Sequence, residues 1–271
     1  MINNAFVIDT DNYLGHFPFR KLFCNTPAEL AKVAESNNVD VLCAASIDAV
    51  FYRNSMDGNM ELYESVKAFE ESGQSPVKYA LFAVINPTYT GFEKDIEKAH
   101  ELGFSGIELL PLYHRYTLGD AKSTEAVKLA ASYHMPVRIR DGFEDFRQRH
   151  QMDVQANLTP AAAAAMVTAV PEASYIFTGF WPEQFLSTTL KDIIPTKKDI
   201  FFSTFKLDLY HIGNNFDTFL EKVGAEHIVI GSNAPFNYME PQFLRLVNSK
   251  KATEADLVKI YGANIKPYLN L

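Results

Sequence analysis

Short apolar runs alternate with longer amphipathic segments along the whole chain. The first run, residues 5–8, is apolar and partly β-branched, which is typical of a fully buried strand. Similar runs follow at residues 39–45, 77–85, 106–112, 136–140, 174–177, 200–205 and 227–230. The pattern therefore predicts eight strands.

Helical patterns occupy the intervals between these strands. The first begins at Thr26, where Pro27 suits the first turn and Glu29 completes a capping box. Further helices are predicted near residues 60–71, 92–102, 123–133, 161–170, 182–193, 216–223, 241–248 and 253–261. The polar stretch 46–59 is expected to be a long loop.

Eight strands with helices between them, in 271 residues, match the pattern and length of a (β/α)8 TIM barrel in the α/β class. A doubly wound sheet is the alternative, but it would need a glycine-rich turn after its first strand. That turn holds one glycine, Gly15. Because no Gly/Ser-rich or Pro-rich linker divides the chain, we expect one domain over residues 1–271.

Charge and composition narrow the classes of partner. The formal net charge is −8, which argues against nucleic acid because phosphate binding needs a basic face. No apolar run approaches the roughly 20 residues of a membrane helix, so no membrane association is expected. Cys24 and Cys43 are too few for a disulfide framework and lack metal-ligand spacing. With no secretory signal at the N-terminus, the sequence predicts a cytoplasmic protein.

Ionisable side chains follow the first strand directly: Asp9, Asp11, Tyr13, His16 and Arg20. Burying such groups is costly unless they meet partners or a ligand. The carboxyl ends of barrel strands are also where ligands bind. We therefore expect a site here, although a polar loop that only caps the core is the alternative.

Later strands end in further polar residues, namely Asp48, Asn86, Glu108, His114, Arg138, Arg140, Glu144, Thr178, Lys206 and Asn233. Strand alternation places Arg138 and Arg140 on one face. A guanidinium that faces the barrel interior must be paired, because it cannot lose its charge. The two arginines could form a buried ion network with the nearby acids, or they could clamp a substrate carboxylate or phosphate.

Five segments carry a resemblance to a known family: IDTDNYLG, GIELLPLYHRY, MPVRIRDG, HIVIGSNAPF and YGANIKPYLNL. Together they resemble the amidohydrolase-related family. The resemblance implies a metal-dependent (β/α)8 barrel that hydrolyses, and sometimes decarboxylates, small carbonyl substrates.

The metal-ligand positions of that family are altered. Its His-x-His pair reads Asp11-Asn12-Tyr13, its fifth-strand histidine is Arg140, its sixth-strand histidine falls at Thr178 or Gly179, and its eighth-strand aspartate is Asn233. A metal needs about three His, Cys or carboxylate donors. We therefore predict no cofactor and no binuclear site. A relocated mononuclear zinc or other divalent metal, held for instance by Asp11, His16 and Glu108, remains an alternative.

These observations predict a hydrolase or decarboxylase that acts without the usual metal on a small anionic carbonyl or carboxylate substrate. Arg138 and Arg140 would hold the anion, and Asp11 or His16 would move a proton. Tyr13 and Asn233 would donate hydrogen bonds to an oxygen that gains charge. The other candidates for substrate binding are Arg20, Glu108, His114 and Glu144.

Other functions remain open at this stage. A non-catalytic ligand-binding protein of the same fold is one alternative, and a metal-dependent hydrolase with a relocated site is another. Aromatic residues on the loops, among them Phe51, Tyr52 and Phe236, could line a substrate site or form a homo-oligomer contact.

Overall fold

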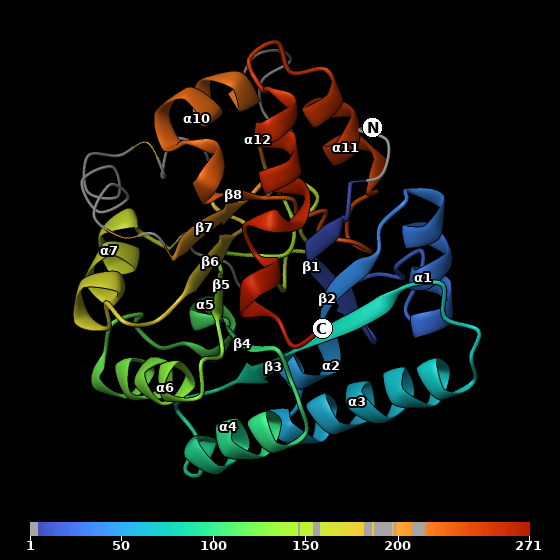
Figure 1. The fold of residues 1–271 in the computed structure, drawn as a ribbon. Coiled ribbons are helices and arrows are strands. Elements are labelled where there is room, and N and C mark those ends of the chain that lie inside the picture. The colour runs from blue at the N-terminus through green and yellow to red at the C-terminus, as the bar shows by residue number, and fades with distance from the viewer. Residues whose placement is uncertain are drawn as a thin grey trace.

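Eight parallel strands form one sheet in sequence order (Figure 1). They are β1 (Ile8–Leu14), β2 (Val41–Ser46), β3 (Lys78–Ile85), β4 (Gly106–Leu109), β5 (Val137–Arg140), β6 (Tyr175–Thr178), β7 (Ile200–Ser203) and β8 (Ile228–Val229). The segment after β8 returns to β1, where Thr10 N donates to Ile230 O at 2.9 Å and Tyr13 N to Ala234 O at 2.8 Å. These bonds bring the last strand to the first, and the predicted (β/α)8 barrel is confirmed.

This computed structural model describes residues 5–145, 147–153, 158–181, 186, 197, 199–207 and 215–271. Its helices surround the strands (Figure 1). They are α1 (Pro27–Ser36), α2 (Ile47–Phe51), α3 (Ser55–Glu71), α4 (Phe92–Glu101), α5 (Pro111–His114), α6 (Ala121–Ser132), α7 (Pro160–Ala169), α10 (Asn215–Val223), α11 (Glu240–Val247) and α12 (Glu254–Val258). Short helical turns lie before β8, at η2 (Ala225–His227), and after α12, at η3 (Lys259–Ala263) and η4 (Lys266–Tyr268). The helix predicted at residues 182–193 lies outside the described residues.

Local sequence signals account for several of these boundaries. The capping box at the start of α1 is present, with the Thr26 side chain accepting from Glu29 N. The prediction of a loop at residues 46–59 is wrong, because α2 and the beginning of α3 occupy most of it. Ser46 and Asn54 each cap one of these helices by accepting a backbone N–H from Ala49 and Met56 respectively. Two polar caps therefore mark helix starts in this stretch.

The first strand is longer than its apolar run. It spans Ile8–Leu14 and contains Asp9, Asp11 and Tyr13, three of the five ionisable residues that the sequence suggested would follow it. A register shift against β2 lies between Asp9 and Asn12. The extra residue of such a bulge changes which side chains point inward, so the functional candidates of β1 lie within the barrel wall.

The barrel has an inner and an outer apolar layer. In β2, Val41, Cys43 and Ala45 belong to the inner layer, whereas Leu42 and Ala44 belong to the layer between strands and helices. This alternation is the period of a parallel strand that is buried on both faces.

The C-terminal segment covers the amino end of the barrel. Asn264 Nδ2 donates to Ala225 O at 2.7 Å and to Ile228 O at 2.8 Å, and Asn270 bonds to Ser105 and Phe104, which precede β4. The side chains at the strand ends therefore face the opposite, carboxyl end. Within the described ranges, no helix combines the length and apolar character needed to cross a membrane.

Gly58 allows α3 to pack closely on α2. A Cβ at this position would lie 2.5 Å from Ala49 N and 2.6 Å from Ala49 Cα. Helix propensity alone would favour Gly58→Ala by about 1 kcal/mol, but the clash with backbone should dominate and lower the free energy of unfolding by about 2 kcal/mol. Urea unfolding tests this, with exposed Glu64→Ala in the same helix as the control. A Gly58→Ala protein as stable as the control would show that the two helices do not pack this closely.

Candidate functional site

Arg140, the last residue of β5, points into the barrel and is surrounded by acceptors. Its Nη2 contacts Asp11 Oδ1, its Nε donates to Tyr13 Oη and lies 3.3 Å from Glu108 Oε1, and its Nη1 donates to Gly142 O at 2.9 Å. Tyr13 Oη in turn donates to Glu108 Oε1. Each of the three guanidinium nitrogens therefore has a partner within the protein.

Arg138 lies one layer deeper on the same face of β5. Its Nη2 is 2.7 Å from Glu108 Oε2, and its Nη1 donates to Thr10 O at 2.7 Å and to Cys43 O at 2.9 Å. Burial opposes its charge, but the neighbouring Glu108, Tyr13 and Asp11 together more than offset this, so the pKa of the guanidinium lies above its ordinary value. Arg138 is therefore a fixed cation.

We call Asp11, Tyr13, Glu108, Arg138, Arg140 and Thr178 the strand-end network. Thr178 Oγ1 completes it by donating to Asp11 Oδ2 at 2.5 Å. Every member is at most 1% exposed. Two arginines face two carboxylates, so the network balances its own charge, as buried ions must.

Burial raises the pKa of Tyr13 well above its ordinary value, although the neighbouring arginines oppose the shift. The phenol is therefore neutral at physiological pH and donates its proton to Glu108. A general base at this position would have to be another group.

The donor set at this end of the barrel does not fit a divalent metal. The guanidinium of Arg140 lies directly on Asp11, the carboxylate that would be the first ligand. Over the described part of the chain, no three His, Cys, Asp or Glu side chains come together in a way that could hold a metal ion. This includes the combination of Asp11, His16 and Glu108.

Phenylalanine rings lie over the carboxyl side of the network. Phe143 packs edge-on to Tyr13 with centroids 4.9 Å apart and stacks on Phe236 at 4.8 Å, and Phe17 packs against Phe236 at 4.8 Å. Phe143 is fully buried and the other two phenylalanines are nearly so. The rings pack over the strand-end network on this side, and each member of the network is at most 1% exposed.

Two other predicted residues bond to the protein itself. Asn233, in the left-handed region at φ 59°, donates its side-chain amide to Phe143 O and to Asn237 Oδ1, both at 2.8 Å. His114 lies in α5 with Nε2 3.2 Å from Val50 O, and burial lowers its pKa to about 4. His114 is therefore uncharged at neutral pH and cannot hold an anion by charge.

His16 and Arg20 are in a different position, on the exposed loop after β1. Arg20 Nε lies 2.5 Å from Glu144 Oε1, and Nη2 donates to Phe236 O at 3.2 Å. The side chain of Arg20 nonetheless stays 38% exposed.

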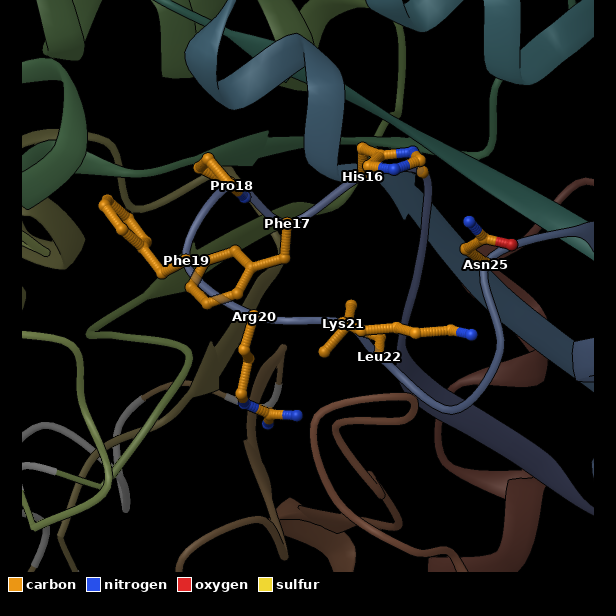
Figure 2. Close-up of a pocket in the computed structure, with 9 residues that line it drawn as sticks. His16, Phe17, Pro18, Phe19, Arg20, Lys21, Leu22 and Asn25 are labelled. Atoms are coloured by element: carbon orange, nitrogen blue, oxygen red, sulfur yellow. The ribbon is translucent and has the colours of Figure 1, made fainter.

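This loop lines an open cavity of about 490 Å³, shown in Figure 2. Its lining residues are Gly15, His16, Phe17, Pro18, Phe19, Arg20, Lys21, Leu22 and Asn25. Three of these side chains are basic and none is acidic. We call it the β1-loop cavity.

Sequence reasoning missed Lys21 in this cavity and Asp141 at the end of β5. Asp141 lies 3.7 Å from the Nζ of Lys206, a residue that the sequence placed at a strand end without a role. Both missed residues lie next to an arginine that was singled out, in Arg20-Lys21 and Arg140-Asp141. Both lie in loops just beyond a strand, where the hydrophobic pattern carries no signal.

The fold is that of the amidohydrolase-type barrels, so the resemblance seen in the sequence is confirmed at the level of fold. The chain is similar to 5-carboxyvanillate decarboxylase from Sphingomonas paucimobilis, with a TM-score of 0.71, 12% identity, and coverage of 97% of this chain and 98% of that one. It is similar to a dihydroxybenzoic acid decarboxylase from Polaromonas sp. with bound manganese and the inhibitor 2-nitroresorcinol, with a TM-score of 0.68, 12% identity, and coverage of 97% and 96%.

A third similar structure is an amidohydrolase II, with a TM-score of 0.65, 13% identity, and coverage of 97% of this chain and 99% of that one. No family model and no curated protein matches the sequence. At these identities the likeness establishes the fold alone.

Replacing Arg140 tests the strand-end network. Arg140→Met leaves Asp11 and Glu108 buried with less positive charge, and should lower the free energy of unfolding by about 3–5 kcal/mol. The control is Arg147→Met, whose ion pair with Asp145 involves a side chain that is 55% exposed, and which should cost at most about 1 kcal/mol. Urea unfolding measures both, and equal losses would contradict the network.

The buried carboxyl group of Asp9 should make the stability of the protein depend on pH. Burial raises its pKa to about 7, although it accepts from Ser232 N at 2.9 Å and from Ser232 Oγ at 2.5 Å. Between about pH 4 and 7 the folded protein then holds a proton that the unfolded chain has lost. The stability of the wild type relative to Asp9→Asn should therefore fall as pH rises through this range, and stay level above it. A difference that does not change with pH would contradict the raised pKa.

Proposed function

We propose that this protein is a metal-independent hydrolase or decarboxylase that acts on a small anionic carbonyl or carboxylate substrate. The observation that carries the proposal is the β1-loop cavity, where His16, Arg20 and Lys21 line a space without an acid. The cavity follows β1 directly, on the carboxyl side of the barrel where ligands bind. In a protein with a net charge of −8, three basic groups around one cavity favour an anion.

In this proposal, anion binding and proton transfer are assigned to residues of the β1-loop cavity rather than to the buried arginines and Asp11. We assign the anion-binding role to Arg20, because its guanidinium is partly exposed, whereas Arg138 and Arg140 are buried and ion-paired with Glu108 and Asp11. His16, which is exposed on the same loop, would move a proton. Glu144 would orient Arg20 through the 2.5 Å ion pair.

The strand-end network would then support the site without touching substrate. Its closed contacts hold the carboxyl ends of β1, β4, β5 and β6 together, where a metal would otherwise link them. Asp11, Tyr13 and Glu108 belong to this framework. Asn233 would also support the site without touching substrate, because its side-chain amide donates to the backbone carbonyl of Phe143.

Hydrolysis and decarboxylation fit the proposal unequally. Without a metal-bound hydroxide, amide hydrolysis lacks activation for its poor leaving group. Lactone hydrolysis needs less activation, because its leaving group is better. Decarboxylation needs a group that accepts the electron pair left when CO₂ departs. Two of the similar folds are decarboxylases of aromatic carboxylates, which supports testing that class first.

A second candidate is a non-catalytic ligand-binding protein. The observation in its favour is that Asp11, Tyr13 and Glu108 are wholly buried. Turnover of a bound carboxylate separates the two functions: release of CO₂ or of a hydrolysed product supports the enzyme, and binding without turnover supports the alternative. Turnover that chelator abolishes and added zinc or manganese restores would contradict metal independence.

Titration calorimetry with dicarboxylates, hydroxybenzoates and keto acids tests the anion site. Arg20→Gln removes a charge-assisted contact and should weaken binding about 10- to 100-fold. Arg115→Gln, an exposed arginine outside the β1-loop cavity, is the matched control. Because Arg20→Gln also leaves Glu144 without its ion pair, Lys21→Gln serves as a second variant. Unchanged binding in both Arg20→Gln and Lys21→Gln would end the proposal.

A further inference from the structure

Lys206 and Asp141 form a separate ionisable pair at the carboxyl end of the barrel. Lys206 follows β7 by three positions, and Asp141 follows β5 directly. Their side chains are 1% and 0% exposed, and Lys206 Nζ lies 3.7 Å from Asp141 Oδ2. This amine belongs neither to the strand-end network nor to the β1-loop cavity.

The pair is not a closed salt bridge. A charge-assisted N–H···O contact is usually about 2.7–2.9 Å long, but here the two atoms are farther apart, and Asp141 Oδ2 accepts no hydrogen bond although it is buried. The other oxygen, Oδ1, accepts from Leu158 N at 2.7 Å. An acceptor that folding leaves unsatisfied in a buried position points to a missing partner.

The backbone conformation of Lys206 also suggests that this pair belongs to a functional site. Its φ is 70°, in the left-handed region that residues other than glycine rarely adopt. Such conformations are strained and recur at functional sites. Here it directs a lysine inward beside Asp141.

Aromatic rings and charges define the surroundings of the amine. Nζ lies 4.8 Å from the ring centroid of Trp181 and 5.8 Å from that of Phe205. Arg140, Asp141 and Asp145 are the charged groups that act on it. Burial lowers the pKa of Lys206 to about 8 despite the attraction of Asp141. Roughly a tenth of the amines are then neutral at pH 7, compared with a few in ten thousand for an ordinary lysine.

We propose that Lys206 is a nucleophile that forms an imine with a small β-keto acid, and that Asp141 transfers the protons for this step. The inference deepens the proposed function and rests on it for the anionic character of the substrate. It supplies the electron acceptor that decarboxylation requires in the absence of a metal.

The chemistry balances without any other reagent. The neutral amine of Lys206 adds to the ketone carbon, Asp141 gives a proton to the departing hydroxyl, and water leaves as a protonated imine forms. The bond to the carboxylate carbon then breaks, CO₂ leaves, and its electron pair moves into the imine to give an enamine. A proton from solvent adds to the enamine carbon. Water then hydrolyses the protonated imine, which releases the ketone and the neutral amine and returns a proton to Asp141.

Borohydride trapping followed by peptide mass spectrometry tests this assignment with two probes, acetoacetate and uncharged acetone. Lys206 should be reductively alkylated at least about tenfold more than any other lysine at pH 7, because far more of its amine is neutral. Lys206→Arg keeps the positive charge beside Asp141 and should lose the label. Lys222→Arg, an exposed lysine on α10, should keep it.

Circular dichroism of Lys206→Arg guards against a loss of label caused by unfolding. If that variant does not fold, the ratio of Lys206 to other lysines in the wild type still decides. Labelling at Lys206 no greater than at the exposed lysines, with both probes, would overturn the inference.

The two probes separate this inference from the proposed anion site. Acetone carries no charge and reports on Lys206 alone. Labelling by acetone, together with acetoacetate binding that is unchanged in Arg20→Gln and Lys21→Gln, would sink the anion site and leave the nucleophile standing. Weaker acetoacetate binding in those variants, together with no label at Lys206, would support the anion site and overturn the nucleophile.

Discussion

The contact between Arg140 and Asp11 inside the barrel is the constraint on which the rest of this structure depends. A guanidinium cannot lose its proton in a protein, so its burial obliges the fold to provide acceptors. Glu108, Tyr13 and a backbone carbonyl provide the others, and Glu108 also pairs with Arg138. Four strands are thereby tied together at their carboxyl ends by charge and hydrogen bonds.

This constraint limits which groups are open to a ligand. The strand-end network is ion-paired within itself and lies beneath Phe143 and Phe236, so the candidate groups of the proposed site are those farther out or to the side. The β1-loop cavity offers basic side chains, and the Lys206–Asp141 pair offers an amine whose partner is not fully engaged. Both connect to the segment after β5, the cavity through Arg20 and Glu144 and the amine through Asp141. That segment is therefore the structural link between anion binding and the proposed nucleophile.

Much of the fold could be predicted from the sequence because apolar runs and helix caps are local signals. Seven of the eight predicted strands overlap the observed ones closely, and the Thr26 capping box starts α1 as expected. The β1 boundary was wrong because a strand that carries buried ions does not look apolar. The loop at residues 46–59 was wrong because Ser46 and Asn54 act as caps rather than as loop residues.

The site was less accessible to sequence reasoning. The sequence predicts Asp11 as a proton-transfer residue and Glu108, Arg138 and Arg140 as substrate-binding residues, with a buried ion network as the alternative for the arginines; the choice depends on three-dimensional pairing. The geometry supports the network. Lys206 carried no distinguishing local pattern, because its left-handed backbone and its separation from Asp141 arise only when β5 and β7 are placed in the barrel.

A double-mutant cycle on Arg140 and Asp11 tests the central claim most directly. The free energy of unfolding is measured for the wild type, Arg140→Met, Asp11→Ala and the double variant. If the two side chains form a buried ion pair, the double variant should be more stable than the sum of the single losses implies, by about 2–3 kcal/mol. Losses that simply add would contradict the account.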